Sequence, residues 1–191
     1  MGNVIFGMTM SLDGFIADQN NSAAALYADY ATLRDTEPMR EAIQNTGAVV
    51  MGWNTFAMAE DPDTYADMYE FQVPLFVLTH TIPAKLPKES ATLTFTFVTD
   101  TLETVIAQAK EAAGEKDVMI VGGAAIGQQC IRARLIDKLD IDIMPVLLGG
   151  GLRLFDTIGT EQIKLERKRV LALPAGRTHL RFSLENKENI R

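Results

Sequence analysis

Two adjacent glycines, Gly122 and Gly123, separate an apolar run from a segment with a helical pattern. Residues 118–121 predict a buried strand, and residues 124–131 predict a helix. A helix that opens on a turn without side chains presents free backbone N–H groups and the positive end of its dipole, and both attract phosphate. The stretch therefore indicates either a phosphate site for a nucleotide or a tight strand-to-helix turn that binds nothing.

A second turn of this kind follows the apolar run 48–51, where Gly52 precedes a predicted helix over residues 53–58. Neither turn has the G-x-G-x-x-G spacing of a doubly wound dinucleotide domain, because Ala124 stands where the second glycine would be. The glycine turns alone therefore do not identify a ligand, and the predicted strands and helices around them are needed to interpret the turns.

The composition restricts the classes of protein. The chain has 191 residues, enough for one domain with a substantial core, and its hydrophobic content of 47% is ordinary. A net charge of -7 argues against a nucleic-acid partner. No apolar run is long enough to cross a membrane, and a strand pattern begins at Val4, so we expect a cytoplasmic protein without membrane contact.

Metal and disulfide chemistry have little support in the sequence. The single cysteine, Cys130, excludes an intrachain disulfide and a cysteine-rich zinc site, and we expect it to be a small buried apolar residue. The H-x-E and P-C-x-x-C motifs of zinc nucleobase deaminases are missing. With only two histidines, His80 and His179, and no suitably spaced ligands, we expect no metal site.

The first two-thirds of the chain alternate predicted strands and helices. This alternation is typical of an α/β fold with a mostly parallel central sheet and helices on both faces. One helix is expected to start at Thr36, with Pro38 in its first turn, to run to about Asn45 and to stop at Gly47. Another is expected after a capping-box-like start at residues 100–103. The strands are predicted at residues 4–8, 48–51, 74–79, 94–98 and 118–121.

The last third of the chain contains strand after strand, at residues 139–146, 163–173 and 179–184. These segments predict antiparallel C-terminal strands at the edge of the sheet. No linker, repeat or low-complexity tract divides the chain, so we expect residues 1–191 to form a single domain. The polar tail from Glu185 is expected to be frayed.

Short motifs in about the first 156 residues occur in an order that is characteristic as a set. They are Ser11-Leu-Asp-Gly14, Val50-Met-Gly-x-x-Thr55, Leu78-Thr79, Val121-Gly-Gly123, Pro145-Val-Leu-Leu-Gly-Gly-Gly151 and Leu154-Phe155. The set resembles the dihydrofolate reductase fold. It is more similar to the C-terminal reductase domain of the bacterial bifunctional riboflavin deaminase-reductase and its stand-alone relatives.

The resemblance implies a nicotinamide coenzyme, NADPH or else NADH, lying across the sheet, and a cis peptide bond between the paired glycines. The phosphates would be held at Gly52, Trp53, Asn54 and Thr55. The adenosine would border Leu78, Thr79 and His80. The pyrophosphate and the nicotinamide would be held by Val121, Gly122, Gly123, Ala124, Ala125 and Ile126.

Two departures from the family pattern bear on the choice of coenzyme. Trp53 replaces the arginine of the family's Met-Gly-Arg, and Thr99 and Asp100 stand where dihydrofolate reductases often have a basic residue. Because those cations bind the 2′-phosphate of NADPH, their absence weakens the preference for NADPH over NADH. Trp53 would either stack on adenine or pack as a surface aromatic. His80 would either contact a phosphate or be an ordinary loop histidine.

Hydride transfer also needs a proton source, and the candidates are carboxylates. Dihydrofolate reductases place one on the helix before the second strand, where this chain has Glu37 and Glu41 on one face and Asp35 just before. Glu37 would otherwise complement the helix dipole. Asp13 lies in a loop expected near the nicotinamide, although Asp-Gly is also common in turns. The catalytic candidates are therefore Asp13 and Glu37.

We expect an NAD(P)H-dependent reductase of a pyrimidine- or pterin-like small molecule. The resemblance implies reduction of 5-amino-6-(5-phosphoribosylamino)uracil in riboflavin biosynthesis. The alternatives are dihydrofolate reduction and a non-catalytic nucleotide-binding or oligomeric protein on the same fold. A homodimer is expected because relatives form one. Candidate substrate contacts are Arg34, Arg40 and Arg153 for a phosphate, and Tyr27, Tyr30, Trp53, Tyr65, Tyr69 and Phe71 for a flat ring.

Overall fold

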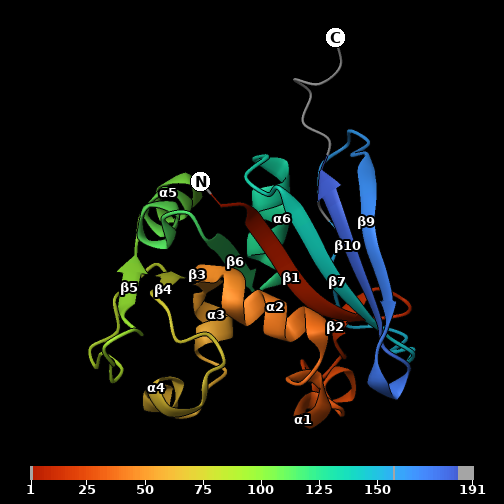
Figure 1. The fold of residues 1–191 in the computed structure, drawn as a ribbon, viewed down its shortest axis with the longest axis horizontal. Coiled ribbons are helices and arrows are strands. Elements are labelled where there is room, and N and C mark those ends of the chain that lie inside the picture. Colours follow the sequence, from red (N-terminus) through yellow and green to blue (C-terminus); the bar gives the residue numbers. More distant parts are fainter. Residues whose placement is uncertain (1, 157, 185–191) are drawn as a thin grey trace.

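A computed structural model describes residues 2–156 and 158–184. Most of its strands form one eight-stranded sheet with the order β5-β4-β3-β6-β1-β7-β10-β9 (Figure 1). A second, two-stranded sheet joins β2 (Phe15–Ala17) to β8 (Leu152–Arg153). The strands of the large sheet are β1 (Val4–Ser11), β3 (Thr46–Gly52), β4 (Leu75–Leu78), β5 (Phe95–Val98), β6 (Asp117–Val121), β7 (Lys138–Met144), β9 (Leu165–Ala172) and β10 (Thr178–Leu184).

The large sheet is parallel from β5 to β7 and antiparallel at β10 and β9. This arrangement confirms the predicted α/β class, with its mostly parallel sheet and antiparallel C-terminal strands. Strand β9 forms the edge and exposes Leu165 and Val170. Association of two copies stays a prediction.

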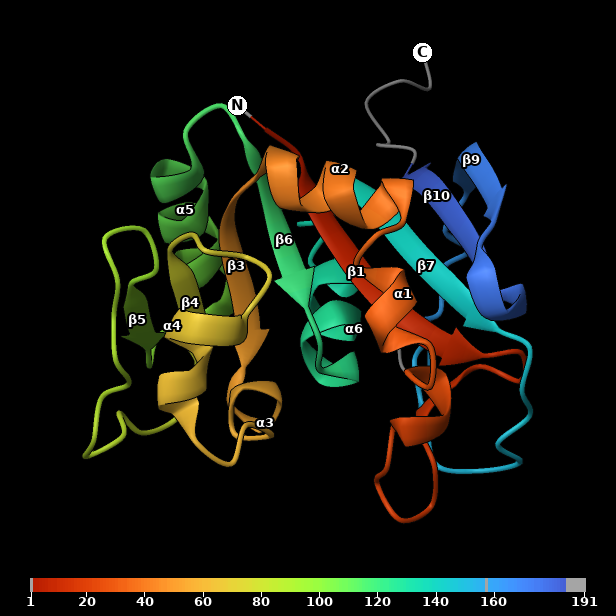
Figure 2. The same cartoon turned by 60° about the horizontal axis from the view of Figure 1, so that its bottom comes forward.

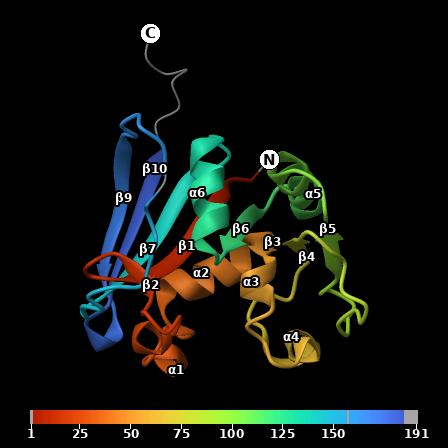
Figure 3. The same ribbon diagram turned by 180° about the vertical axis from the view of Figure 1, so that it is seen from behind.

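Helices cover both faces of the large sheet, as Figures 1 and 3 show from opposite sides. Helices α5 and α6 pack on one face, and α2 crosses the other (Figure 2). No helix in the described part of the chain is long and apolar enough to cross a membrane. The helices are α1 (Tyr30–Leu33), α2 (Glu37–Asn45), α3 (Trp53–Phe56), α4 (Tyr65–Met68), α5 (Leu102–Ala113) and α6 (Ala124–Arg132), with 3-10 turns at Ala24–Leu26, Pro62–Thr64 and Pro174–Gly176.

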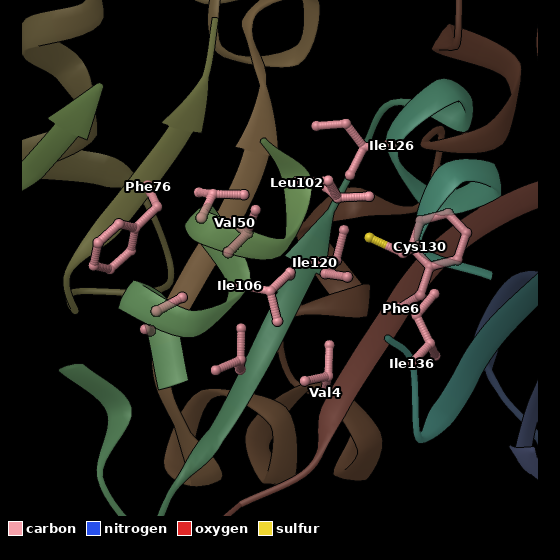
Figure 4. Close-up of a cluster of buried hydrophobic side chains, with 14 of the residues drawn as sticks. Val4, Phe6, Val50, Phe76, Leu102, Ile106, Ile120, Ile126, Cys130 and Ile136 are labelled. Carbon is pink, nitrogen blue, oxygen red and sulfur yellow. The ribbon is translucent and has the colours of Figure 1, made fainter. Parts of the chain in front are cut away.

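The core under α5 and α6 holds α6 close to β1 (Figure 4). A Cβ atom on Gly127 would lie 2.1 Å from the Phe6 ring, so only glycine permits this approach. Cys130 is buried in the same cluster, and burial raises the pKa of its thiol to about 12. Its predicted role as a small apolar core residue is confirmed.

The two ends of α2 differ from the predicted capping. Helix α2 ends at Asn45, as predicted, but the predicted role of Gly47 as its C-terminal stop is wrong, because that residue lies inside β3. A Cβ atom on Gly47 would lie 2.7 Å from Ala113 O, so glycine at this position permits the close contact between β3 and the end of α5. The Thr36 hydroxyl donates to Leu33 O and does not cap α2. The tail from Glu185 lies outside the described residues.

Candidate functional site

The paired glycines form the turn between β6 and α6. Gly122 has a φ of 71° and Gly123 a φ of 77°, values that favour glycine over other residues. The predicted cis bond between them is wrong, since the described residues contain no cis peptide bond. The reversal of the chain is achieved by the two left-handed backbone conformations, so a trans bond suffices.

The two strand–glycine–helix turns lie side by side because β3 and β6 are parallel neighbours. A Cβ atom on Gly122 would lie 2.6 Å from Thr55 Cγ2, and one on Gly52 would lie 2.9 Å from Ile126 Cδ1. Because the glycines have no side chains, Thr55 of one turn and Ile126 of the other can each pack against the backbone of the opposite turn. No side chain caps α6, so its first backbone N–H groups remain available at the surface of the turn.

A groove of about 980 Å³, here called the turn groove, runs along these turns and the end of β4. Of the predicted coenzyme residues, all but Val121, Gly122 and Ala124 line it. This volume lies in the upper range for ligand sites. The lining residues that were predicted are Gly52, Trp53, Asn54, Thr55, Leu78, Thr79, His80, Gly123, Ala125 and Ile126.

The turn groove carries little positive charge. Asp100 is the one carboxylate among its described lining residues, and no lysine or arginine lines it. The Trp53 side chain is exposed, and its ring contacts Phe56, with 5.6 Å between the ring centroids. Trp53 therefore packs against the protein while one part of its ring remains open to the groove. His80 lines the groove from the loop after β4.

A second cavity, here called the sheet pocket, lies between α2, the segment 27–33 and the opposite face of the sheet from α6. Its volume is about 150 Å³. Three of the predicted aromatic residues line it, namely Tyr27, Tyr30 and Phe71. The Tyr30 hydroxyl donates to Glu70 Oε2 at 3.2 Å across the rim. Val121 also lines the sheet pocket.

Arg177 holds the segment 27–33 against the sheet. Its side chain is fully buried, and its guanidinium donates to both carboxylate oxygens of Asp29 at 3.0 and 2.5 Å. It also donates to Thr9 Oγ1 at 2.9 Å, to Asp142 Oδ2 at 3.3 Å and to Leu26 O at 2.9 Å. Hydrogen bonding from Arg177 lowers the pKa of Asp29 below its usual value. One buried cation thus joins three parts of the chain behind the sheet pocket.

His179 and Asp142 form a pair in the wall of the sheet pocket. They are direct neighbours across β10 and β7, so their side chains share one face of the sheet. His179 Nδ1 lies 2.8 Å from Asp142 Oδ1. The imidazole is almost completely buried, and its Nε2 atom has no hydrogen-bond partner among the described residues.

The carboxylates predicted on α2 lie in a charge network at the edge of the sheet. Glu37 accepts from Arg169 Nη2 at 2.6 Å, and Glu41 accepts from Arg169 and Arg181 at 2.8 and 2.7 Å. Neither glutamate lines the sheet pocket or the turn groove. The role of Glu37 as proton donor stays a hypothesis. In this geometry Glu37 attaches α2 to β9, and Glu41 attaches it to β9 and β10.

Asp13 attaches the glycine-rich turn after β7 to the end of β1. Its carboxylate accepts from Ser11 Oγ at 2.6 Å and from the backbone amides of Leu148 and Gly149 at 3.1 and 2.7 Å. The hydrogen bond from Ser11, aided by the two amides, lowers the Asp13 pKa to about 2. A carboxylate that stays ionised in this way is poorly suited to donate a proton near neutral pH.

Asp13 is expected to titrate near pH 2, which carboxyl carbon NMR during acid titration can measure. Its folded pKa lies below the ordinary value of 3.8, so it stabilises the fold above about pH 4. This contribution fades as the pH falls from about 4 towards 2. Ser11→Ala removes the strongest donor to Asp13 and should move the midpoint of its titration to higher pH. A wild-type titration midpoint near pH 4 would contradict the stabilisation of the Asp13 carboxylate by these hydrogen bonds.

The remaining predicted contacts are dispersed. Arg40 donates to Asp35 O, and the guanidinium of Arg153 lies 4.5 Å from the centre of the Phe15 ring. These arginines and Arg34 do not line the sheet pocket. Tyr65 and Tyr69 pack in the aromatic cluster near β5, and burial raises the pKa of both hydroxyls.

Sequence reasoning did not select Arg177, Asp142 or His179. A signal was present in the strand 139–146, where alternation places Asp140 and Asp142 on one face of a half-buried strand. Buried carboxylates need partners, so this pattern indicates cations or histidines on a neighbouring strand. Nothing in the sequence indicated which strand would supply them.

The fold and the turn groove define the class of protein. A mostly parallel sheet with a groove at the carboxyl ends of its strands is the arrangement of nucleotide-binding α/β proteins. A dihydrofolate reductase from Enterococcus faecalis, solved with NADP(H), has a TM-score of 0.64 to this chain. Identity is 14%, and the match covers 97% of this chain and 98% of that one. The chain is therefore a dihydrofolate reductase-like protein in fold.

Residues 3–178 match the RibD C-terminal domain, and the chain belongs to that family. A Shewanella sp. PV-4 protein assigned to riboflavin biosynthesis is similar, with a TM-score of 0.77, 23% identity, and coverage of 96% of this chain and 99% of that one. The deaminase/reductase from Thermotoga maritima matches with a TM-score of 0.68 and 14% identity, over 96% of this chain and 57% of its own. No curated protein matches the sequence. The resemblance predicted from the motifs is confirmed.

Proposed function

We propose that the chain is an NAD(P)H-dependent reductase of a pyrimidine-like heterocycle, with the coenzyme in the turn groove and the ring in the sheet pocket. One observation carries the proposal: Val121 lines the sheet pocket, and Gly123, two residues later, lines the turn groove. The turn between β6 and α6 thus separates a long groove from a small pocket. A dinucleotide in one and a substrate ring in the other would meet at this turn.

The residues present fit the coenzyme. The paired glycines place no side chain of their own between the start of α6 and the groove, so a pyrophosphate can come close to the backbone. Thr55 lies against the same turn and offers a hydroxyl to the groove. When bound, the reduced nicotinamide would supply the hydride. The chain's own contribution is to hold the phosphates and to enclose the ring.

Titration of nicotinamide fluorescence tests the proposal directly. We expect NADPH and NADH to bind with comparable affinity, because the described lining of the groove has Asp100 and no arginine or lysine for a 2′-phosphate. Family membership favours NADPH, and the measured ratio of dissociation constants decides between them. If neither coenzyme binds at millimolar concentration, the reductase proposal is wrong and a non-catalytic protein on this fold remains.

The substrate is tested by coenzyme oxidation in the presence of candidate heterocycles. Membership of the RibD C-terminal domain family supports 5-amino-6-(5-phosphoribosylamino)uracil as the first compound, and the dihydrofolate reductase-like fold supports dihydrofolate as the second. Turnover of the first and not the second would establish the riboflavin-type reaction. The reverse result would favour dihydrofolate reduction.

A further inference from the structure

One nitrogen atom of a residue that lines the sheet pocket lacks the partner that its burial requires. The His179 side chain is 5% exposed, and its Nε2 atom has no hydrogen-bond partner among the described residues. Buried polar atoms are nearly always paired with protein or water. Since the imidazole forms part of the pocket wall, a ligand in the pocket can provide the missing partner.

The surroundings of His179 fix the orientation of its ring. Asp142 on β7 holds Nδ1 at 2.8 Å, so a neutral imidazole carries its proton on Nδ1 and leaves Nε2 as an acceptor. When the ring is protonated, Nε2 becomes a donor and Asp142 balances the charge. Arg177 contacts the other oxygen of Asp142 and is itself paired with Asp29. Tyr27 lies near Arg177 and Asp142 in the same wall.

We propose that His179 contacts the bound substrate through Nε2 and supplies the proton for reduction of the substrate's C=N or C=O bond. This inference deepens the proposed function and rests on it. The carbon of a C=N or C=O bond takes the hydride from a dihydronicotinamide, and the π electron pair of that bond moves to the heteroatom. The heteroatom takes the proton from Nε2, and the imidazolium becomes neutral while Nδ1–H still donates to Asp142. A proton from solvent then restores the imidazolium.

The charges of the sheet pocket define the class of substrate. The carboxylates that line it are Glu70, Asp140 and Asp142, and no lysine or arginine belongs to its described lining. The two nearby guanidiniums, of Arg177 and Arg181, are already paired with carboxylates. A volume of about 150 Å³ holds one ring. The ring that binds there is therefore neutral or cationic, and any phosphate on the substrate lies outside the pocket.

Nitrogen NMR of the imidazole tests the contact without coenzyme. The chain has only two histidines, so in a His80→Gln variant every imidazole signal belongs to His179. We expect millimolar 6-aminouracil to shift the Nε2 signal by several parts per million, since Nε2 gains a hydrogen-bond partner, and to move Nδ1 much less. Unchanged His179 signals at that concentration would overturn the proposal.

Kinetics of His179→Gln test the proton transfer. We expect kcat to fall about 10²- to 10⁴-fold with little change in KM, as for loss of a general acid. Thermal unfolding and coenzyme fluorescence confirm that the variant folds and that the turn groove is intact. A kcat within tenfold of wild type would overturn the assignment.

The two proposals fail in distinguishable ways. If wild-type protein does not bind NADPH or NADH, the reductase function is lost, but the NMR experiment still shows whether His179 contacts a ring. If coenzyme binds and turnover occurs while His179→Gln remains active, the reductase function stands and the proton has another source.

Discussion

Gly123→Val is expected to weaken binding of NADPH and NADH by at least ~100-fold while the protein still folds. The valine methyl groups would stand where the coenzyme phosphates approach the amides that open α6, because this residue lines the turn groove. Loss of one or two hydrogen bonds to a charged group costs about 3 kcal/mol, which corresponds to roughly a hundredfold in affinity. Fluorescence titration of both coenzymes measures the change.

Gly114→Val is the matched control for this experiment. Gly114 follows α5 with a φ of 62°, similar to the 77° of Gly123, and an added Cβ would meet no atom within 4 Å. Both variants therefore carry a comparable backbone strain of about 1–3 kcal/mol, visible as a loss of thermal stability. Only Gly123→Val should lose coenzyme affinity. Equal affinities in the two variants would show that the phosphates do not approach this turn.

Arg177→Met is expected to lower the free energy of unfolding by about 3–5 kcal/mol, as for removal of one partner from a buried ion pair. The change removes a fully buried guanidinium that is bonded to Asp29, Asp142 and Thr9. It leaves the Asp29 carboxylate buried without its cation, so the segment 27–33 should also detach from the sheet pocket. Chemical denaturation gives the free energy, and proteolysis reports the detachment.

Arg134→Met is a chemically identical control at the surface. Arg134 pairs with Glu161 at 3.1 Å, and both side chains are more than half exposed, so the expected loss is below about 1 kcal/mol. Adding Asp29→Asn to Arg177→Met should recover part of the stability, because it removes the buried carboxylate that has lost its cation. If Arg177→Met lowers the free energy of unfolding no more than Arg134→Met does, the buried hydrogen-bond network of Arg177 does not hold the pocket wall.

The pH dependence of stability separates the same two variants. Since Arg177 lowers the pKa of Asp29, this carboxylate stabilises the wild-type fold above about pH 4 and loses its contribution as the pH falls through its folded pKa. The Arg177→Met protein lacks the interaction, so its stability should decline less between neutral and acidic pH. Arg134→Met should follow the wild-type profile.

The sequence by itself determined the parts of the site that depend on local pattern. The apolar run 118–121, the paired glycines and the helix that follows predicted a bare turn, and the structure contains it. The alternation of strands and helices also predicted a mostly parallel sheet, and in the structure β3 and β6, which precede the two glycine turns, are parallel neighbours. Ordered motifs with these spacings then sufficed to predict the family.

Only the tertiary structure decided which polar side chains share the sheet pocket. His179 meets Asp142 through the antiparallel register of β10 on β7, and a shift of one residue would turn either side chain to the other face. Arg177 meets Asp29 across 148 residues of sequence. Periodicity indicates that such groups are half-buried, but it carries no information about which distant strand pairs with which. For that physical reason the glycine turn was predictable, whereas the histidine and its carboxylate were not.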